Sequence, residues 1–372
     1  MVTKLKLWYS TIKNTYKFIR SASDSFYDYY MRHHKVIGWY RGLPVYSAFL
    51  NPGMSEALGN LFSRRVIGDL IGRELPTMVN IAVTDICNAK CEHCSFYSAM
   101  DKPGEKVLST DQMKSVIKEC QDFGIAIMNF VGGEPLLRKD LCELIEFIDK
   151  EKTTSSIFTN GWFLKEKAKG LKMSGVMMVI TSLDSVDSEK HDKFRRLPGL
   201  FHRAIDGIKE CQKNKLLTGI STTVTQEDLL NGDFEKMIHF AKELSVNELI
   251  VIDTMPIGMY SHREDLSRNK IDRLKLLSLV DKYNSKKNYP GIFCYAHFRD
   301  QSAFGCSAGR NYFYISPYGE IHPCDFTAKP IGSLLIEPIS TLWFKLNDQR
   351  KSMNGHYANQ CCSQEPLKIK IN

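Results

Sequence analysis

The stretch TDICNAKCEHCSFY (residues 84–97) places three cysteines, Cys87, Cys91 and Cys94, within eight residues. It directly follows TMVNIAVT (77–84), a short apolar run of the kind that forms a buried strand. The three thiols are therefore expected in a loop at the end of a strand. Clustered cysteines in a reducing compartment usually bind metal or carry out redox chemistry, so this loop is the first candidate for a functional site.

The spacing of these cysteines argues against a structural zinc site, which usually takes four ligands from paired Cys-x-x-Cys units. His93 lies directly between Cys91 and Cys94, so it is poorly placed to bind the same ion as they do. The spacing also differs from the Cys-x-x-Cys-x-x-Cys of bacterial ferredoxins. A four-iron cluster held by three thiolates leaves one iron open for a substrate or cosubstrate, and this is the interpretation we favour over cysteines placed by chance.

The region that follows alternates strands with helices. Its helical patterns include STDQMKSVIKECQDFG (109–124) and LCELIEFIDKEK (141–152). The apolar runs between turn signals are 77–84, 125–133, 154–161, 176–184, 217–224 and 248–256. Six such β-then-α units in a row predict an α/β fold with a parallel sheet and helices outside.

Composition and charge narrow the class of protein. The 372 residues are 43% hydrophobic and 25% charged, as expected of a globular chain, and no apolar run approaches a membrane span. The lysine-interrupted N-terminus lacks the apolar core of a secretory signal, so we expect a cytoplasmic protein whose eleven cysteines are reduced. Of the net charge of +8, residues 1–76 carry +6, which argues against a general nucleic-acid binder.

The segment CNAKCEHC (87–94) resembles the signature of the radical S-adenosylmethionine (SAM) superfamily, and the resemblance extends over roughly residues 77–256. It implies a partial (β/α)6 TIM-like barrel with this loop after the first strand. It also implies that the three thiolates hold a [4Fe-4S] cluster, whose fourth iron is chelated by the amino and carboxylate groups of SAM. One electron, from a donor such as flavodoxin or ferredoxin, then cleaves SAM to methionine and a 5′-deoxyadenosyl radical that abstracts hydrogen.

A second motif of this family, VGGEPLL, closes the second predicted strand. Gly132 and Gly133 let the backbone come close to a ligand, and Glu134 offers a carboxylate for an ammonium group. The resemblance implies that this Gly-Gly-Glu-Pro segment, which ends at Pro135, binds the amino group of SAM. By itself such a segment indicates only a turn. Its position one βα unit after the cysteines makes the resemblance to this family specific.

Three further segments resemble the family. Asn160 lies in TNG at the end of the third strand, Ser182 and Asp184 lie in SLD at the end of the fourth, and Arg195 ends HDKFR. The resemblance implies contacts of Ser182 and Asp184 with the ribose of SAM and of Arg195 with its carboxylate. Arg196 makes the last assignment ambiguous by one residue. An ordinary turn and a solvated helix start are the alternatives.

The late cysteines form a second group. FGCSAGRNYFYISPYGEIHPCDF (304–326) resembles the opening of the SPASM and twitch auxiliary-cluster domains, and ISTLW (339–343) resembles their tail. The resemblance implies a second [4Fe-4S] cluster on Cys306 and Cys324, which bracket a predicted hairpin. Its remaining candidate ligands are Cys361, Cys362 and Cys294. There are too few cysteines for the two clusters of a full SPASM domain, and a small zinc site or structural cysteines are the alternatives.

The N-terminal region is rich in aromatic residues, with twelve of the forty Phe, Trp and Tyr in the first fifty positions. Apolar residues recur at helical spacing over residues 5–19 and lysines lie off that stripe, which predicts a basic amphipathic helix. Residues 1–50 are thus expected either to contact a membrane surface, on its inner face, or to pack on the barrel. A second helix is predicted from Ser55 to Pro76.

Together these observations predict a helical extension (1–76), a radical SAM core barrel (77–290) and an auxiliary-cluster domain (291–372). The expected activity is SAM cleavage followed by hydrogen abstraction from a peptide or a small biosynthetic substrate. A lipid- or membrane-associated small-molecule enzyme is one alternative. A non-catalytic iron–sulfur or zinc protein is another.

Overall fold

The computed structural model describes residues 35–96, 102, 104–254, 258–260, 271–298, 306–327 and 329–352. The amphipathic helix predicted over residues 5–19 lies outside these residues. The same holds for two of the candidate auxiliary ligands, Cys361 and Cys362.

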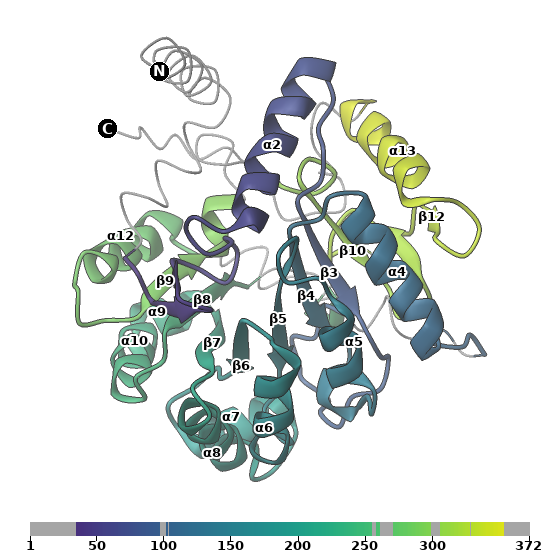
Figure 1. Cartoon of the computed structure of the whole chain (residues 1–372). Coiled ribbons are helices and arrows are strands. Elements are labelled where there is room, and N and C mark those ends of the chain that lie inside the picture. The colour runs from purple at the N-terminus through teal and green to yellow at the C-terminus, as the bar shows by residue number, and fades with distance from the viewer. Residues whose placement is uncertain are drawn as a thin grey trace, which may run out of the picture.

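The body of the described chain is one ten-stranded sheet that curves into an open barrel (Figure 1). Its central strands are β3 (Met78–Ala82), β4 (Ile127–Val131), β5 (Thr154–Thr159), β6 (Met178–Ser182), β7 (Leu217–Val224) and β8 (Glu248–Asp253). These six strands pair in parallel in chain order. The predicted α/β fold with a partial (β/α)6 barrel is therefore confirmed.

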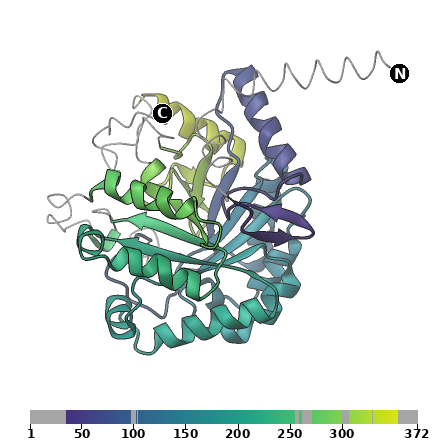
Figure 2. The same ribbon diagram turned by 90° about the vertical axis from the view of Figure 1, so that its left-hand side faces the viewer.

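Helices cover the outer face of this sheet (Figures 1 and 2). They are α4 (Thr110–Asp122), α5 (Leu141–Phe147), α6 (Leu164–Ser174), α7 (Ser188–Arg195), α8 (Leu200–Lys213), α9 (Gln226–Leu230), α10 (Asp233–Glu243) and α12 (Arg273–Asn284), with single 3-10 turns η1 (Pro135–Leu137), η2 (Gly258–Tyr260) and η3 (Tyr295–Phe298). The sequence places an apolar stripe on each long helix. In α8, for example, Leu200, Ala204 and Ile208 are fully buried at a spacing of four residues.

Segments from residue 291 onward extend the barrel sheet at both edges. They are β9 (Gly291–Cys294), β10 (Tyr312–Ile315), β11 (Glu320–His322), β12 (Gly332–Ser333) and the helix α13 (Ile339–Ser352). Strand β9 adds in parallel to β8, and β10 adds in parallel to β3 before the predicted hairpin to β11. In the described residues this region is thus continuous with the barrel rather than the separate unit expected from residue 291. The exposed edges of β3 and β8 provide the hydrogen-bonding groups that make this possible.

The base of the barrel is closed by the segment after the hairpin of β1 (Gly38–Tyr40) and β2 (Leu43–Val45) (Figure 2). Phe49 enters the barrel and packs against Phe293, with ring centroids 4.3 Å apart. Glu248, at the start of β8, accepts hydrogen bonds from the Ser47 hydroxyl (2.6 Å) and the Ala48 amide (2.8 Å). Residues 45–50 are thus largely buried, which corrects the expectation that the whole of residues 1–50 could face a membrane.

The helix predicted from Ser55 is present as α2 (Glu56–Ile71). The Ser55 side chain caps it by accepting a hydrogen bond from the Leu58 amide, and Gly72 ends it in the left-handed conformation at φ 63°. Among the described helices, none combines the length and apolar character required to cross a bilayer.

Glu248 makes the closure of the barrel base sensitive to pH. Burial raises the pKa of this carboxyl from 4.5 to about 7, although the Ser47 and Ala48 hydrogen bonds oppose the shift. Between these pH values the folded chain keeps a proton that the unfolded chain has lost, so stability falls as pH rises from about 4.5 to 7. We predict that Glu248→Gln removes this loss, which amounts to on the order of 3 kcal/mol. Denaturant unfolding of the wild type and of Glu248→Gln at pH 5 and pH 7.5 gives the free energies of unfolding that test this prediction. An equal change with pH in the two proteins would contradict it.

Candidate metal and cofactor site

The three cysteines of the opening motif lie in the loop that leaves the C-terminal end of β3. Parallel α/β barrels place their sites at this end of the strands. Cys87 is exposed, whereas Cys91 and Cys94 are half-buried, and the Cys94 amide donates to the Cys91 carbonyl at 3.4 Å. Burial raises the pKa of the Cys91 thiol, while the neighbouring Arg195 guanidinium favours its thiolate. Iron binding here therefore has to displace protons from the thiols.

The three thiols of the loop do not converge on a position for one metal ion. In the described part of the chain, no three His, Cys, Asp or Glu side chains converge closely enough to hold one metal ion. A structural zinc ion would need such a converged set. A four-iron cluster takes each thiolate on a different iron, so a short loop with three separated thiols suits it.

Gly132 and Gly133 are required by the cysteine loop itself. The Gly133 amide donates to the Thr84 carbonyl (2.9 Å) and the Glu134 amide donates to the Ile86 carbonyl (2.8 Å). A Cβ atom on Gly133 would lie 2.1 Å from the Ile86 carbonyl oxygen, and Gly132 has φ +141°. The close approach seen in the structure is to the backbone that leads into Cys87, and the predicted approach to a ligand stays a prediction.

Glu134 is fully buried, and its carboxylate is fixed by the end of β5. One oxygen accepts from the Thr159 hydroxyl (2.5 Å) and the Leu136 amide (3.0 Å), and the other accepts from the Asn160 amide (2.7 Å). Burial raises the pKa of this carboxyl, and the three hydrogen bonds oppose the shift. Pro135 follows it and begins η1. A carboxylate has about four acceptor positions, so one remains on the oxygen that Asn160 contacts.

Asn160 also connects the third strand to the cysteine loop. Its side-chain amide donates to the Asn88 side-chain oxygen at 2.8 Å, one residue after Cys87. The predicted site residues Glu134 and Asn160 therefore lie together with the cysteine loop, at the ends of adjacent strands.

Arg195 and Asp184 form a buried ion pair beside the cysteines. The Arg195 Nε atom lies 2.6 Å from Asp184 Oδ2, and their side chains are 9% and 4% exposed. A terminal nitrogen of Arg195 lies 3.8 Å from the Cys91 sulfur. Burial alone would raise the pKa of Asp184, but the guanidinium holds it well below its ordinary value. The Arg196 side chain is 56% exposed and lies 3.7 Å from Glu92, so Arg195 is the arginine that lies beside the cysteines.

Ser182, the other residue assigned to the ribose, is the last residue of β6 and is partly buried. It pairs with Ser221 of β7 in the register of the sheet. Asp184 follows two residues later, and its second oxygen accepts from the Thr223 amide at 3.0 Å. Both residues thus lie at the strand ends that carry the rest of the site.

Helix α7 packs directly on the cysteine loop. The His93 ring stacks on the Phe194 ring with centroids 4.6 Å apart, and the Lys90 amide donates to the Arg195 carbonyl at 3.3 Å. His93 therefore serves in packing, in agreement with its poor placement as a fourth ligand. His191 also contributes, because its Nδ1 accepts from the Asp184 amide at 3.2 Å.

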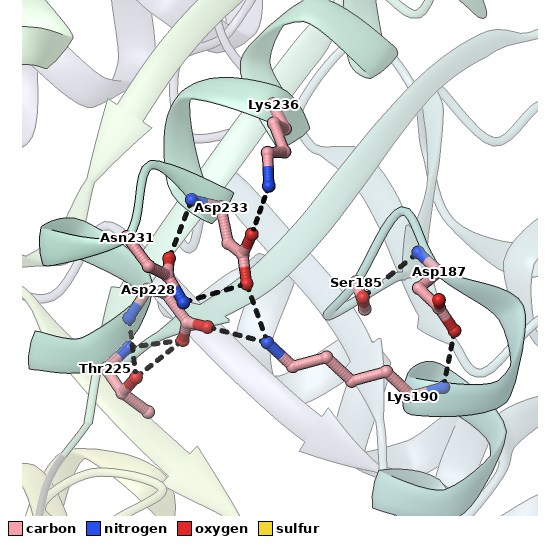
Figure 3. A network of polar contacts seen from close by, with 8 residues as sticks. All are labelled: Ser185, Asp187, Lys190, Thr225, Asp228, Asn231, Asp233 and Lys236. Carbon is pink, nitrogen blue, oxygen red and sulfur yellow. Dashed lines mark hydrogen bonds and ion pairs between the residues drawn. The ribbon is translucent and has the colours of Figure 1, made fainter.

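A network on the outer side holds α7 in place (Figure 3). The Lys190 ammonium reaches from α7 to Asp228 of α9 (3.1 Å) and Asp233 of α10 (2.9 Å). Asp187 caps α7 by accepting from the Lys190 amide at 2.8 Å. These contacts fix the helix that carries Arg195, although each exposed ion pair adds little stability by itself.

A polar network inside the barrel was not predicted from the sequence. The Asn129 side-chain amide donates to Asn80 (2.9 Å), and that of Asn80 donates to Asp325 (3.0 Å), which also accepts from the Tyr312 hydroxyl. Burial raises the pKa of Asp325. The sequence signal from which it could have been inferred is that Asn80 and Asn129 interrupt the apolar runs of β3 and β4. The network joins the barrel to the hairpin next to Cys324 and offers a buried carboxyl for proton exchange.

The described late cysteines do not all come together. Cys306 and Cys324 pack on the same hydrophobic core. Cys294 lies in a different core, beneath α12, because alternation along β9 turns it outward while Phe293 points into the barrel. Cys294 is therefore corrected from a candidate ligand to a core residue. No disulfide joins any of the nine described cysteines.

Close packing at Gly133 yields a prediction. Gly133→Ala should displace the Ile86 carbonyl and the cysteine loop, cost about 1–3 kcal/mol of stability, and lower the iron bound by Cys87, Cys91 and Cys94. The matched control is Gly59→Ala in α2, where a Cβ atom meets nothing within 4 Å. Iron analysis after anaerobic reconstitution compares the two variants. Wild-type iron and stability in Gly133→Ala would show that the loop does not depend on this contact.

Comparison with known proteins agrees with this geometry. The model of the Radical SAM superfamily matches residues 81–241. The Fe-coproporphyrin III synthase of Methanosarcina barkeri is 37% identical over 318 residues, which cover 75% of this chain and 78% of that protein. The AdoMet-dependent heme synthase of the same organism is 27% identical over 289 residues, covering 72% and 82%.

Solved structures show the same fold. Streptococcus suis SuiB bound to the precursor peptide SuiA superposes with a TM-score of 0.62 at 17% identity, covering 81% of this chain and 71% of SuiB. Sequence similarity over three-quarters of the chain, the shared fold and the cysteine loop lead to one conclusion: the chain belongs to the radical SAM superfamily of enzymes.

Proposed function

We propose that this chain is a biosynthetic radical SAM enzyme that acts on an iron porphyrin or a closely related iron tetrapyrrole. The observation that carries the proposal is the 37% identity to an Fe-coproporphyrin III synthase over 318 residues. The heme synthases matched over similar lengths point to the same class of compound. A small-molecule substrate is therefore favoured over a peptide, because SuiB, at 17% identity, supports only the fold.

In this proposal Cys87, Cys91 and Cys94 hold a [4Fe-4S] cluster, which when bound supplies the electron that cleaves SAM. The Nε–H group of Arg195 donates a hydrogen bond to Asp184. The other N–H groups of the guanidinium are the proposed donors to the SAM carboxylate. The ion pair fixes the guanidinium next to Cys91, where the carboxylate would chelate iron. The paired charge also stabilises Arg195 in a buried position.

The remaining proposed contacts with SAM come from residues at the C-terminal ends of the strands. The Gly132–Gly133 backbone and the open acceptor position of Glu134 suit the SAM ammonium group. Asp184 and Ser182 are the proposed partners of the ribose. Asn160 is a further proposed SAM-binding residue, because its side chain contacts the cysteine loop.

An auxiliary [4Fe-4S] cluster on Cys306 and Cys324 is the second part of the proposal. The resemblance of residues 304–326 to auxiliary-cluster domains supports it, and Cys361 or Cys362 would complete the ligands. The role we propose for it is to take or relay an electron. Contact of the N-terminal segment with a membrane surface is retained as a proposal only for residues 1–34.

Binding of the substrate class can be measured directly. We expect the reconstituted enzyme to shift the Soret absorption band of Fe-coproporphyrin III or heme at micromolar concentration. We also expect the porphyrin to increase 5′-deoxyadenosine formation in the presence of SAM and dithionite, because a bound substrate consumes the radical. SAM cleavage that is indifferent to both porphyrins, with no Soret shift, would contradict the assignment of substrate while leaving the radical SAM chemistry intact.

A further inference from the structure

Four polar side chains cross the barrel sheet in a single row, which we call the polar row. They are Tyr314 of β10, Asn80 of β3, Asn129 of β4 and Ser156 of β5, and each pairs with the next in the register of the sheet. All four are buried, and Tyr314, Asn129 and Ser156 have no exposed surface. Polar groups in such a position destabilise the fold unless they have hydrogen-bond partners.

The polar row faces the interior of the barrel. Side chains alternate between the two faces of a strand, and the neighbours Ile81 and Ile157 pack outward, in one core with residues of α4, α5 and α6. The residues of the polar row are therefore on the opposite face. In agreement, the Tyr314 ring packs in a separate cluster with Ala82 and Val131, the last residues of β3 and β4.

Asp325 fixes the direction of the hydrogen bonds along the polar row. Its carboxyl accepts from the Asn80 side-chain amide at 3.0 Å and from the Tyr312 hydroxyl. The side-chain oxygen of Asn80 accepts in turn from the Asn129 side-chain amide at 2.9 Å. Since the amide group of Asn129 is the donor in this bond, its Oδ1 atom remains as an acceptor.

Three atoms of the polar row have no hydrogen-bond partner among the described residues. They are Asn129 Oδ1, Ser156 Oγ and the hydroxyl oxygen of Tyr314. A buried polar atom without a partner is destabilising, so a ligand that provides the missing partners would be bound favourably. Asn129 Oδ1 can only accept, whereas the two hydroxyls can also donate. Together they complement a ligand group that has both an O–H donor and a carbonyl acceptor.

The polar row lies close to the cysteine loop. The ring of Phe96, two residues after Cys94, has its centroid 5.8 Å from that of Tyr314. Phe158 of β5 packs against the same cluster, and both phenylalanines remain partly exposed. Partly exposed aromatic rings suit the flat face of a macrocycle. A ligand group held by the polar row would thus keep the rest of the ligand beside these rings and near the cysteines.

We propose that the polar row is the recognition site for a carboxylic acid side chain of the substrate, bound in its protonated form. Fe-coproporphyrin III and heme carry such side chains, so this inference rests on the proposed function. The carboxyl O–H donates to Asn129 Oδ1, and the carboxyl carbonyl oxygen accepts from the hydroxyls of Ser156 and Tyr314. Adjacent strands lie about 4.8 Å apart, so one carboxyl group can bridge Asn129 and Ser156. An ionised carboxylate has no donor for Asn129, and burial favours the neutral acid.

Removal of single hydroxyl groups tests the proposal. Ser156→Ala and Tyr314→Phe each delete one unpartnered oxygen atom and leave the rest of the side chain in place. Ser155→Ala is the matched control, because Ser155 is only 2% exposed and its Oγ atom also lacks a partner within the described residues. Alternation along β5 places Ser155 on the outer face of the sheet. Titration of the reconstituted full chain with Fe-coproporphyrin III, followed at the Soret band, gives the dissociation constants.

We expect the dissociation constant to rise roughly tenfold in Ser156→Ala and in Tyr314→Phe and to stay at the wild-type value in Ser155→Ala. Thermal unfolding without porphyrin should show no loss of stability in the first two variants, because the deleted hydroxyls have no partner to lose. The infrared spectrum of bound porphyrin with ¹³C-labelled carboxyl groups should contain the carbonyl band of a carboxylic acid, which the free porphyrin lacks at neutral pH.

Two kinds of failure can be told apart. Wild-type affinity in both Ser156→Ala and Tyr314→Phe would mean that the polar row holds only ordered water, and it would overturn the proposal while leaving the porphyrin as substrate. Infrared bands of carboxylates alone would overturn it as well. A wild type that binds no porphyrin would overturn the proposed substrate and this inference with it.

Discussion

The candidate site depends on the absence of side chains at Gly132 and Gly133. Without Cβ atoms there, the backbone after β4 lies against residues 84–86 and donates two amide hydrogen bonds to their carbonyl groups. These bonds fix the start of the cysteine loop relative to Glu134, and through Glu134 to the end of β5. Without these bonds the loop that carries the three thiols would have many conformations. The free energy of cluster binding would then have to offset the entropic cost of ordering the loop.

Strand β3 connects the functional features of the chain. The cysteine loop leaves its C-terminal end, and Asn80 at its centre contacts Asp325 of the C-terminal segment. A hollow lined by Arg64, Arg65, Arg73 and Arg310 lies at its N-terminal end. Because β10 pairs with β3 in parallel, Cys306 and the residues after it reach the barrel without a separate domain interface.

Much of this could be predicted from the sequence, because the signals were local. Apolar runs between turn signals predicted all six barrel strands, and Ser55 predicted the start of α2. The superfamily motifs singled out Glu134 and Asp184, which follow the ends of β4 and β6, and Arg195, which ends α7.

What the sequence could not predict depends on contacts between distant segments. The Asn80–Asp325 contact spans 245 residues, and Ser47 reaches Glu248 across 201. The burial of residues 45–50, and the separation of Cys294 from Cys306, likewise follow from which strands pair. Glycine in the Gly-Gly-Glu-Pro segment indicated a close approach, but only the structure shows that the approach is to the cysteine loop.

The most direct test of the account is the iron and sulfide content of the reconstituted wild type and of the Cys87/Cys91/Cys94→Ala variant, together with 5′-deoxyadenosine formation. We expect about eight irons in the wild type and about four in the variant, as for one [4Fe-4S] cluster on the triad and one on the late cysteines, with no SAM cleavage in the variant. SAM cleavage that persists without the three cysteines, or iron content that does not fall, would contradict the central claim.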